Sequence, residues 1–263
     1  MNHRVQWIGF LTLLEKEILR FVRVGMQTIL SPLINAVLYL LIFGVSLASL
    51  LKTQQGVTYL EFLIPGLVAL SSLNNSLQNS ASSIMISKFH GDLQDLRVVP
   101  LTALSIVSAY SLACLMRGLL VGFLVLILGE IVFFFRMEGV IYPAHPLSLV
   151  VTMVLGCLIF GNFGIWAGFI SKSFDHINAV TNFIVLPLIY LGGVFFSLSI
   201  LHPFWQKVAL FNPMVYFING MRWGILGISD IPFHVCLGVS AFFVAVSSGL
   251  AWYSVRNGSY QRF

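Results

Sequence analysis

Six long apolar stretches, separated by short polar connections, dominate the hydropathy pattern of this chain. A helix needs about 20 apolar residues to cross the hydrocarbon of a bilayer. Each stretch reaches that length, so the pattern predicts an all-α integral membrane protein with six transmembrane helices. The predicted spans are Ile29–Leu51, Tyr59–Met85, Ala103–Phe135, Leu147–Ile170, Ile177–Phe196 and Phe233–Val255.

The first 25 residues precede these spans and have a different pattern. Trp7, Phe10, Leu14, Ile18 and Phe21 recur at helical spacing, while most of the charged residues fall on other faces. This distribution predicts an amphipathic helix that lies at the membrane interface on the cytoplasmic side. A helix that binds a cytoplasmic protein would have the same pattern.

The connection between the fifth and sixth spans, residues 197–232, is too broken to cross a membrane and too apolar for an ordinary aqueous loop. Pro203 and Pro213 each remove a backbone donor and interrupt a helix that runs through them. Trp205, Phe211 and Tyr216 lie around these breaks. This pattern therefore predicts that the segment forms short re-entrant helices, which enter the membrane partway and return.

The basic residues predict the orientation of the spans. Nine of them lie in the termini and connections of one side, against four on the other side, and Arg117 lies within the third span. Because Lys and Arg are enriched in cytoplasmic loops, both termini are expected in the cytoplasm and residues 197–232 outside. The larger group comprises Arg4, Lys16, Arg20, Arg23, Lys88, Arg97, Lys172, Arg256 and Arg262; the smaller comprises Lys52, Arg136, Lys207 and Arg222.

The predicted cytoplasmic connection at residues 87–100 is rich in charged side chains. Gly91 breaks the preceding helix, Asp92, Asp95 and Arg97 fit a short polar helical turn, and Pro100 ends it. Such a stretch is either a solvated turn between two spans or a docking helix for a cytoplasmic protein.

The second span carries a polar face in its lower half. Five of its polar residues share one face at helical spacing: Ser71, Asn75, Gln78, Asn79 and Ser82. Amide groups that face lipid are costly, so this face should meet another helix or line a hydrated path. The sequence leaves both interpretations open.

Arg117 is the clearest ionisable residue inside a span. Its long side chain could extend to the cytoplasmic interface, because the third span is longer than a bilayer requires. It could equally pair with a buried group or contact a substrate. Coupled carriers usually place carboxylates near the membrane midplane, and the pattern shows none there.

Composition supports membrane residence and excludes several function classes. Of the 263 residues, 58% are hydrophobic and only 9% are charged, against about 25% charged in soluble domains. Because the sequence shows no linker, low-complexity tract or convincing internal repeat, residues 26–263 are expected to form one membrane domain. The 14 basic residues are dispersed, which argues against nucleic-acid binding, and the three cysteines lie inside apolar runs. No P-loop or H-E-x-x-H motif is present, and the histidine spacing suits no metal site.

Four stretches of this sequence resemble the membrane subunit of ABC-2 type transporters. They are FLIPGL at Phe62–Leu67, KFHGDLQDLRVVPL at Lys88–Leu101, RGLLVG at Arg117–Gly122 and LGGVFFSLSILHPFWQKVALFNPMVYFINGMR at Leu191–Arg222. The last is the most specific, through Gly193, Phe195, Phe196, Pro203, Trp205, Asn212, Pro213 and Arg222. The family often has Leu-Pro where this chain has His202-Pro203. Within the family, the chain is similar to uncharacterised Gram-negative inner-membrane permeases encoded beside an ATPase, and more distantly to polysaccharide, nodulation-factor and drug exporters.

The resemblance implies the permease of an ATP-binding cassette exporter in the bacterial inner membrane. Two copies would pair with two copies of a separate ATPase, which would bind ATP and Mg²⁺, so no cofactor is expected in this chain. The substrate would be lipid-linked, a glycan or an amphiphile. The alternatives are a secondary transporter or channel that works without an ATPase, and an intramembrane enzyme, for which the sequence shows no convergent nucleophile and base.

The resemblance also assigns expected roles to three groups of residues. The ATPase-docking group is Lys88, His90, Asp92, Asp95, Arg97, Glu15 and Arg20. The translocation path is lined by Asn35, Ser71, Asn75, Gln78, Asn79, Ser82 and Arg117. The external rim contains Phe195, Phe196, Trp205, Tyr216 and Arg222.

Overall fold

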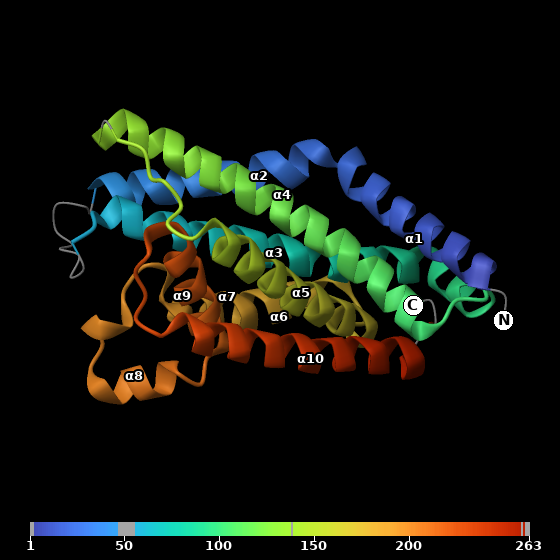
Figure 1. Cartoon of the computed structure of the whole chain (residues 1–263). Coiled ribbons are helices and arrows are strands. Elements are labelled where there is room, and N and C mark those ends of the chain that lie inside the picture. The colour runs from blue at the N-terminus through green and yellow to red at the C-terminus, as the bar shows by residue number, and fades with distance from the viewer. Residues whose placement is uncertain (1–2, 47–55, 138, 259, 261–263) are drawn as a thin grey trace.

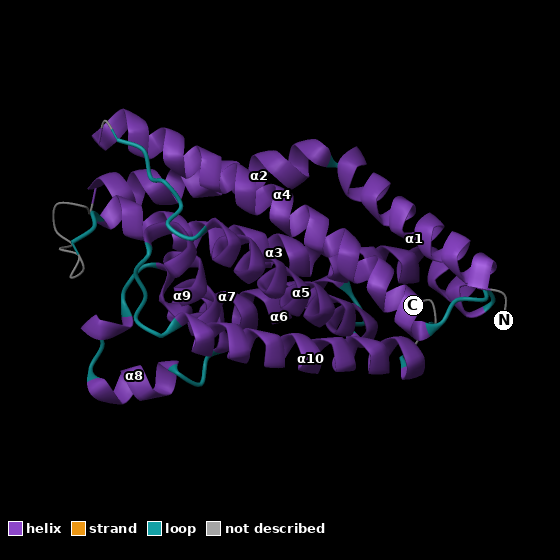
Figure 2. Ribbon diagram, viewed as in Figure 1, coloured by secondary structure: helices purple, strands orange, loops and turns teal. Residues whose placement is uncertain are grey.

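The computed structural model describes residues 3–46, 56–137, 139–258 and 260, and every regular element in these ranges is helical (Figures 1 and 2). The long helices are α1 (His3–Arg23), α2 (Gly25–Tyr39), α3 (Tyr59–His90), α4 (Ala103–Met137), α5 (Pro146–Ile170), α9 (Pro213–Leu226) and α10 (Phe233–Asn257). The expected end of the first span at Leu51, together with Lys52 and Arg262, lies outside the described residues.

Shorter elements complete the chain. A π-helical segment, η1 (Leu40–Ser46), extends α2, and a short 3₁₀-helix, η2 (Asp92–Arg97), follows α3. The fifth predicted span is built from α6 (Phe174–Val180), η3 (Thr181–Val185), α7 (Leu186–Ile189) and η4 (Tyr190–Val194). The connection after it contains η5 (Leu198–Ile200) and α8 (Pro203–Ala209).

Four of these helices have the length and composition of a membrane span, namely Ala103–Arg136, Pro146–Ile170, Phe174–Val194 and Phe233–Asn257. The pair His3–Arg23 and Thr28–Gly44, bent by 55°, meets the same requirement as one broken span. The described residues therefore contain four to five apolar spans. Helix α3 is not among them, because the serines and amides of its second half lower its hydropathy.

Local sequence explains where α3 begins and ends. Thr58 and Glu61 form a capping box, in which the Glu61 carboxylate accepts from the Thr58 backbone N–H at 2.5 Å and the Thr58 hydroxyl accepts from the Glu61 N–H at 3.4 Å. Gly91 ends the helix with φ of 90°, a conformation that glycine adopts without strain. The short helical turn predicted after Gly91 is confirmed as η2.

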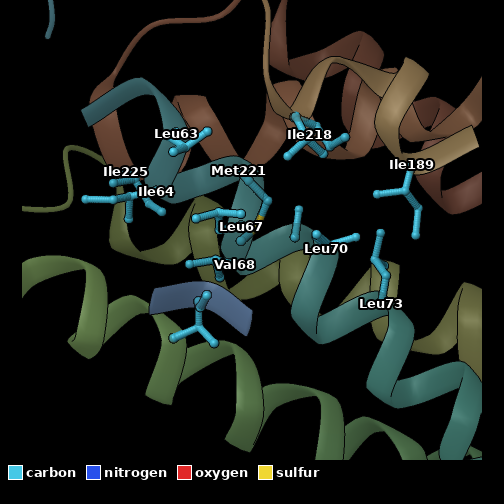
Figure 3. Close-up of a cluster of buried hydrophobic side chains, with 14 of the residues drawn as sticks. Leu63, Ile64, Leu67, Val68, Leu70, Leu73, Ile189, Ile218, Met221 and Ile225 are labelled. Carbon is cyan, nitrogen blue, oxygen red and sulfur yellow. The ribbon is translucent and has the colours of Figure 1, made fainter. Parts of the chain in front are cut away.

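Helix α3 is the centre of the bundle and is buried along most of its length. It packs against α4, α5 and α9. Figure 3 shows its first half, where Leu63, Ile64 and Leu67 of α3 lie close to Ile218 and Met221 of α9. Leu77, Ile84 and Met85 in the second half are buried as well, so the polar residues of that half lie among packed apolar side chains.

Glycines on α5 allow close packing against α3. A Cβ added to Gly164 would come within 2.4 Å of the Leu77 carbonyl oxygen of α3. That contact involves backbone, which cannot move aside cheaply. Membrane helices use such small residues to approach one another closely, since dispersion rather than water exclusion joins them in lipid.

Substitution of Gly164 by alanine is therefore expected to destabilise the bundle by about 1–3 kcal/mol through overpacking. The measurement is the thermal unfolding midpoint of the detergent-solubilised protein. Gly249→Ala on α10 is the matched control, because a Cβ there meets nothing within 4 Å. An equal midpoint for both variants would contradict the packing described above.

The molecule has two distinct ends. Figure 1 marks both chain ends toward the same end of the bundle, whereas α8 lies toward the opposite end. Gly193, with φ of 93°, turns the chain from η4 toward α8. Exposed side chains cover α8, while α9 is largely buried between α3, α5 and α10.

Candidate functional site

A polar cavity of about 650 Å³ lies between the N-terminal helices, α3, α4 and the broken fifth span. Its apolar wall includes Val24, Leu70, Ile86 and Leu186. The polar lining is Arg20, Thr28, Ser31, Asn35, Tyr39, Ser71, Asn74, Asn75, Gln78, Ser82, Arg117 and Tyr190. Six of the seven residues expected on the translocation path therefore line one cavity. The seventh, Asn79, binds two of the lining arginines.

Arg20 extends from α1 onto the polar face of α3. Its Nη2 donates to the carbonyl and the side-chain oxygen of Asn79 at 2.8 and 2.9 Å, and Nη1 donates to the Ser82 hydroxyl at 3.4 Å. The sequence placed Arg20 in the docking group. In the structure, α1 does carry Arg20, but its guanidinium lines the cavity.

Glu17 orients Arg20 from within α1. Its Oε2 lies 3.2 Å from Arg20 Nε and accepts a 2.6 Å hydrogen bond from Ser83 of α3. The Glu17 side chain is fully buried. Sequence reasoning missed it, although the spacing of Leu13, Glu17 and Phe21 puts all three on one helical face, the face that α1 buries.

Arg117 of α4 also faces α3. Its Nη2 donates to Asn75 Oδ1 at 3.2 Å and its Nη1 to Asn79 Oδ1 at 3.4 Å. Of the alternatives that the sequence left open, the structure shows pairing with buried amides rather than extension to the interface. Arg20 and Arg117 share the Asn79 oxygen as an acceptor, so the two guanidinium groups lie side by side.

The amides of α3 also join helices. Gln78 Nε2 donates to the Thr181 hydroxyl of η3 at 3.3 Å, which ties α3 to the broken fifth span. Asn75 Nδ2 donates to the Ser71 carbonyl one turn earlier at 3.0 Å. The same side chains therefore hold the cavity walls together and line the cavity, so the two interpretations of this polar face are compatible.

The remaining docking candidates lie on one side of the bundle. Glu15, His90, Asp92, Asp95 and Arg97 are exposed. Beneath them, one apolar cluster joins α1, η2, the start of α4 and the C-terminal residues through Leu13, Leu93, Ile106, Val255 and Tyr260. The charged side chains of α1 and η2 therefore lie on a base of packed apolar residues.

Arg97 contributes to that base as well as to the surface. Its guanidinium carbon lies 4.4 Å from the centre of the Tyr260 ring, and Nη2 donates to the Gly258 carbonyl at 3.4 Å. Burial raises the pKa of the Tyr260 hydroxyl, an effect that the Arg97 charge partly offsets. These contacts fasten η2 to the C-terminal end of α10.

Lys88 differs from the other docking candidates because its side chain is fully buried. Its ammonium donates to three carbonyls at the C-terminal end of α5, those of Gly168 at 2.9 Å, Phe169 at 2.5 Å and Ser171 at 3.1 Å. A lysine in this position satisfies backbone acceptors that end a helix. We therefore remove Lys88 from the set available to a partner and assign it to joining α3 and α5.

The external candidates are spread over different depths. Trp205 on α8 is 58% exposed, and Tyr216 on α9 is half-buried with its hydroxyl donating to the Leu210 carbonyl at 2.9 Å. Phe196 is also half-buried. Phe195 turns inward and packs against the rings of Tyr39 and Tyr190, with centroids 5.6 Å away in each case. Of the five expected rim residues, only Trp205 of α8 is more than half exposed.

Arg222 is buried rather than at a rim. Its guanidinium carbon lies 3.8 Å from the centre of the Phe62 ring of α3, and Nη2 donates to the Gly193 carbonyl. Asn212, the N-cap residue of α9, also joins two elements. Its Nδ2 donates to the Leu188 carbonyl of α7 at 2.7 Å. These polar residues fix α9 to α3 and to the end of the fifth span.

Comparison with known proteins places the chain among transport permeases. The family model described as ABC-2 type transporter matches residues 9–226. The inner membrane transport permease YadH of Escherichia coli strain K12 is 36% identical over 252 residues, which cover 96% of each chain. Nodulation protein J of Rhizobium leguminosarum bv. viciae is 23% identical over 247 residues, 91% of this chain and 90% of the relative.

Proposed function

Because this chain belongs to the ABC-2 type transporter family, we propose that it is the permease subunit of an ATP-driven exporter. Permeases of this family normally work with an ATPase subunit. The apolar helices and the inner-membrane relative support a multi-pass position in the inner membrane. The observation that carries the proposal is the polar cavity, since a bundle with a purely structural role gains nothing from lining a cavity with two arginines and several amides.

The proposed membrane domain has six spans, formed by α2 with η1, by α3, α4 and α5, by the segment Phe174–Val194, and by α10. Helix α3 has 32 residues, about 48 Å at 1.5 Å per residue, which exceeds the thickness of the hydrocarbon. Its neighbours shield its polar groups from lipid, so it need not be apolar. Helix α1 is the proposed interfacial helix, with both chain termini in the cytoplasm.

A second copy of the chain is proposed to close the translocation path. Ser31 and Asn35 of α2 are exposed beside the cavity, and Asn178 and Asn182 of the fifth span are exposed as well. Polar side chains on these surfaces would be costly in contact with lipid. A homodimer that pairs these faces would place two cavities against each other and shield them.

The ATPase is proposed to dock on α1 and η2, through Glu15, His90, Asp92, Asp95 and Arg97. This chain has no P-loop motif, so ATP and Mg²⁺ would bind to the partner. Closure of the ATPase dimer would push on η2 and α1. The buried Glu17–Arg20 pair would transmit that motion to the cavity, because it joins α1 directly to α3.

At the opposite end, α8 and the exposed aromatic residues near it are proposed to form the rim of the exit. Phe204 and Trp205 are both more than half exposed, and aromatic rings of this kind sit well at a membrane–water interface. A lipid-linked, glycan or amphiphilic substrate would leave past these rings.

The decisive experiment combines the permease with a candidate partner, a P-loop ATPase sought first among the genes beside its own. We expect the two chains to co-purify from membranes and the permease to raise ATP turnover several-fold in native lipid. Substitution of the P-loop lysine of the ATPase should abolish transport while leaving assembly intact. Substrate flux through the permease alone, without ATP, would contradict the proposal and favour a secondary transporter or channel.

A further inference from the structure

Two guanidinium groups face the cavity, but only one carboxylate accompanies them. Glu17 pairs with Arg20 at 3.2 Å. Arg117 is hydrogen-bonded to the amide oxygens of Asn75 and Asn79, and within the described ranges it has no ion pair. Its Nε is buried without a hydrogen-bond partner there. The cavity therefore carries an uncompensated positive charge.

An uncompensated charge at this depth is costly unless a counter-ion accompanies it. Amide oxygens stabilise a guanidinium only in part, because they carry partial charges. The planar fork of arginine matches carboxylate and phosphate oxygens, and paired donors make that match bidentate. Two adjacent arginines lining one cavity thus fit an anionic group.

The remaining walls indicate what is attached to that anion. Leu70, Ile86 and Leu186 add apolar side chains to the lining, the first two from either end of the polar stretch of α3 and the third from α7. The volume of about 650 Å³ is within the range of small-molecule sites, roughly 300–1,000 Å³. A ligand with a charged head and an apolar tail would contact both the polar and the apolar lining residues, whereas a free inorganic anion would leave the apolar residues without a contact.

We propose that the cavity binds the anionic headgroup, phosphate or carboxylate, of an amphiphilic substrate, with Arg117 and Arg20 as its two cationic contacts. The inference rests on the proposed transport function and specifies its substrate class. Arg117 supplies the charge that the protein leaves unpaired. Glu17 restrains Arg20 against α3, so that the second guanidinium is already in position when the headgroup arrives.

The test measures binding of radiolabelled dodecyl phosphate to the full chain, without the ATPase, in phosphatidylcholine nanodiscs. We expect saturable binding that Arg117→Gln and Arg20→Gln each weaken by about tenfold or more. Arg117→Lys, which keeps the charge, should bind more tightly than Arg117→Gln. Arg136→Gln is the matched control, because Arg136 is exposed at the far end of α4, and it should leave affinity unchanged.

Competition identifies the part of the ligand that is recognised. Dodecanoate should displace dodecyl phosphate, and uncharged dodecyl maltoside should not. Inorganic phosphate that competes as well as dodecyl phosphate would overturn the amphiphile assignment. Equal binding by the wild type, Arg117→Gln and Arg20→Gln would overturn the site. Since no ATPase is present, failure here leaves ATP-coupled function to be judged by its own experiment.

Discussion

Reversal of the charges at Asp92 and Asp95 to lysine is expected to uncouple the permease from its ATPase. Both carboxylates are exposed on η2, and the neighbouring Leu93 is fully buried in the cluster that joins η2 to α1. Loss of one partner of a charge pair that an interface buries typically costs about 2–5 kcal/mol, so for carboxylates covered by the docked ATPase we expect binding to weaken roughly 30-fold or more. Permease-stimulated ATP turnover should then fall to the rate of the ATPase alone.

The measurement compares co-purification and ATP turnover of the double variant Asp92→Lys, Asp95→Lys with those of Asp175→Lys. Asp175 is an exposed carboxylate in the first turn of α6, on the same predicted side of the membrane. Its reversal should change neither quantity. Exposed substitutions usually alter stability by no more than about 0.5 kcal/mol, so both proteins should fold. Unchanged turnover in the double variant would show that η2 is not the docking element.

Lys88→Met is expected to lower stability rather than to weaken docking. The substitution removes three charge-assisted hydrogen bonds and leaves the carbonyls that end α5 without this donor. A loss of about 3 kcal/mol follows from the cost of unpaired buried groups. For a chain of this size that corresponds to a fall of roughly 5–10 °C in the unfolding midpoint.

Lys172→Met is the control for that measurement, because Lys172 is exposed just beyond the same end of α5. Its midpoint should stay within about 2 °C of the wild type. If Lys88→Met instead unfolded at the wild-type temperature and lost only the stimulated ATP turnover, Lys88 would act at the docking surface, as the sequence pattern first indicated.

Periodicity alone identified much of the cavity. The serines and amides of α3 recur at helical spacing, and in a lipid environment such a face has to turn toward protein or water. Asn75, Gln78 and Ser82 do line the cavity. The break at Gly91 and the turn after it were equally predictable, because glycine ends helices for a local backbone reason.

Residues whose role depends on a distant partner were not predictable in the same way. Lys88 and Arg97 belong to one charged stretch of sequence, yet one is buried against α5 and the other packs on Tyr260. In the sequence, Glu17 is one of several charged residues on an amphipathic helix. Only the structure shows that its carboxylate contacts Ser83 and Arg20. Sequence spacing gives the direction of a side chain but not what lies there.

The sequence by itself determined that this is a helical membrane protein with a polar face on its second predicted span, because hydropathy and the 3.6-residue period are local properties. It also carried the family signature at Leu191–Arg222. Only the tertiary structure decided that Arg20 and Arg117 share Asn79, and that Lys88 and Arg222 are buried. Those arrangements depend on how α1, α3, α4 and α5 pack, and packing brings together residues that no local pattern relates.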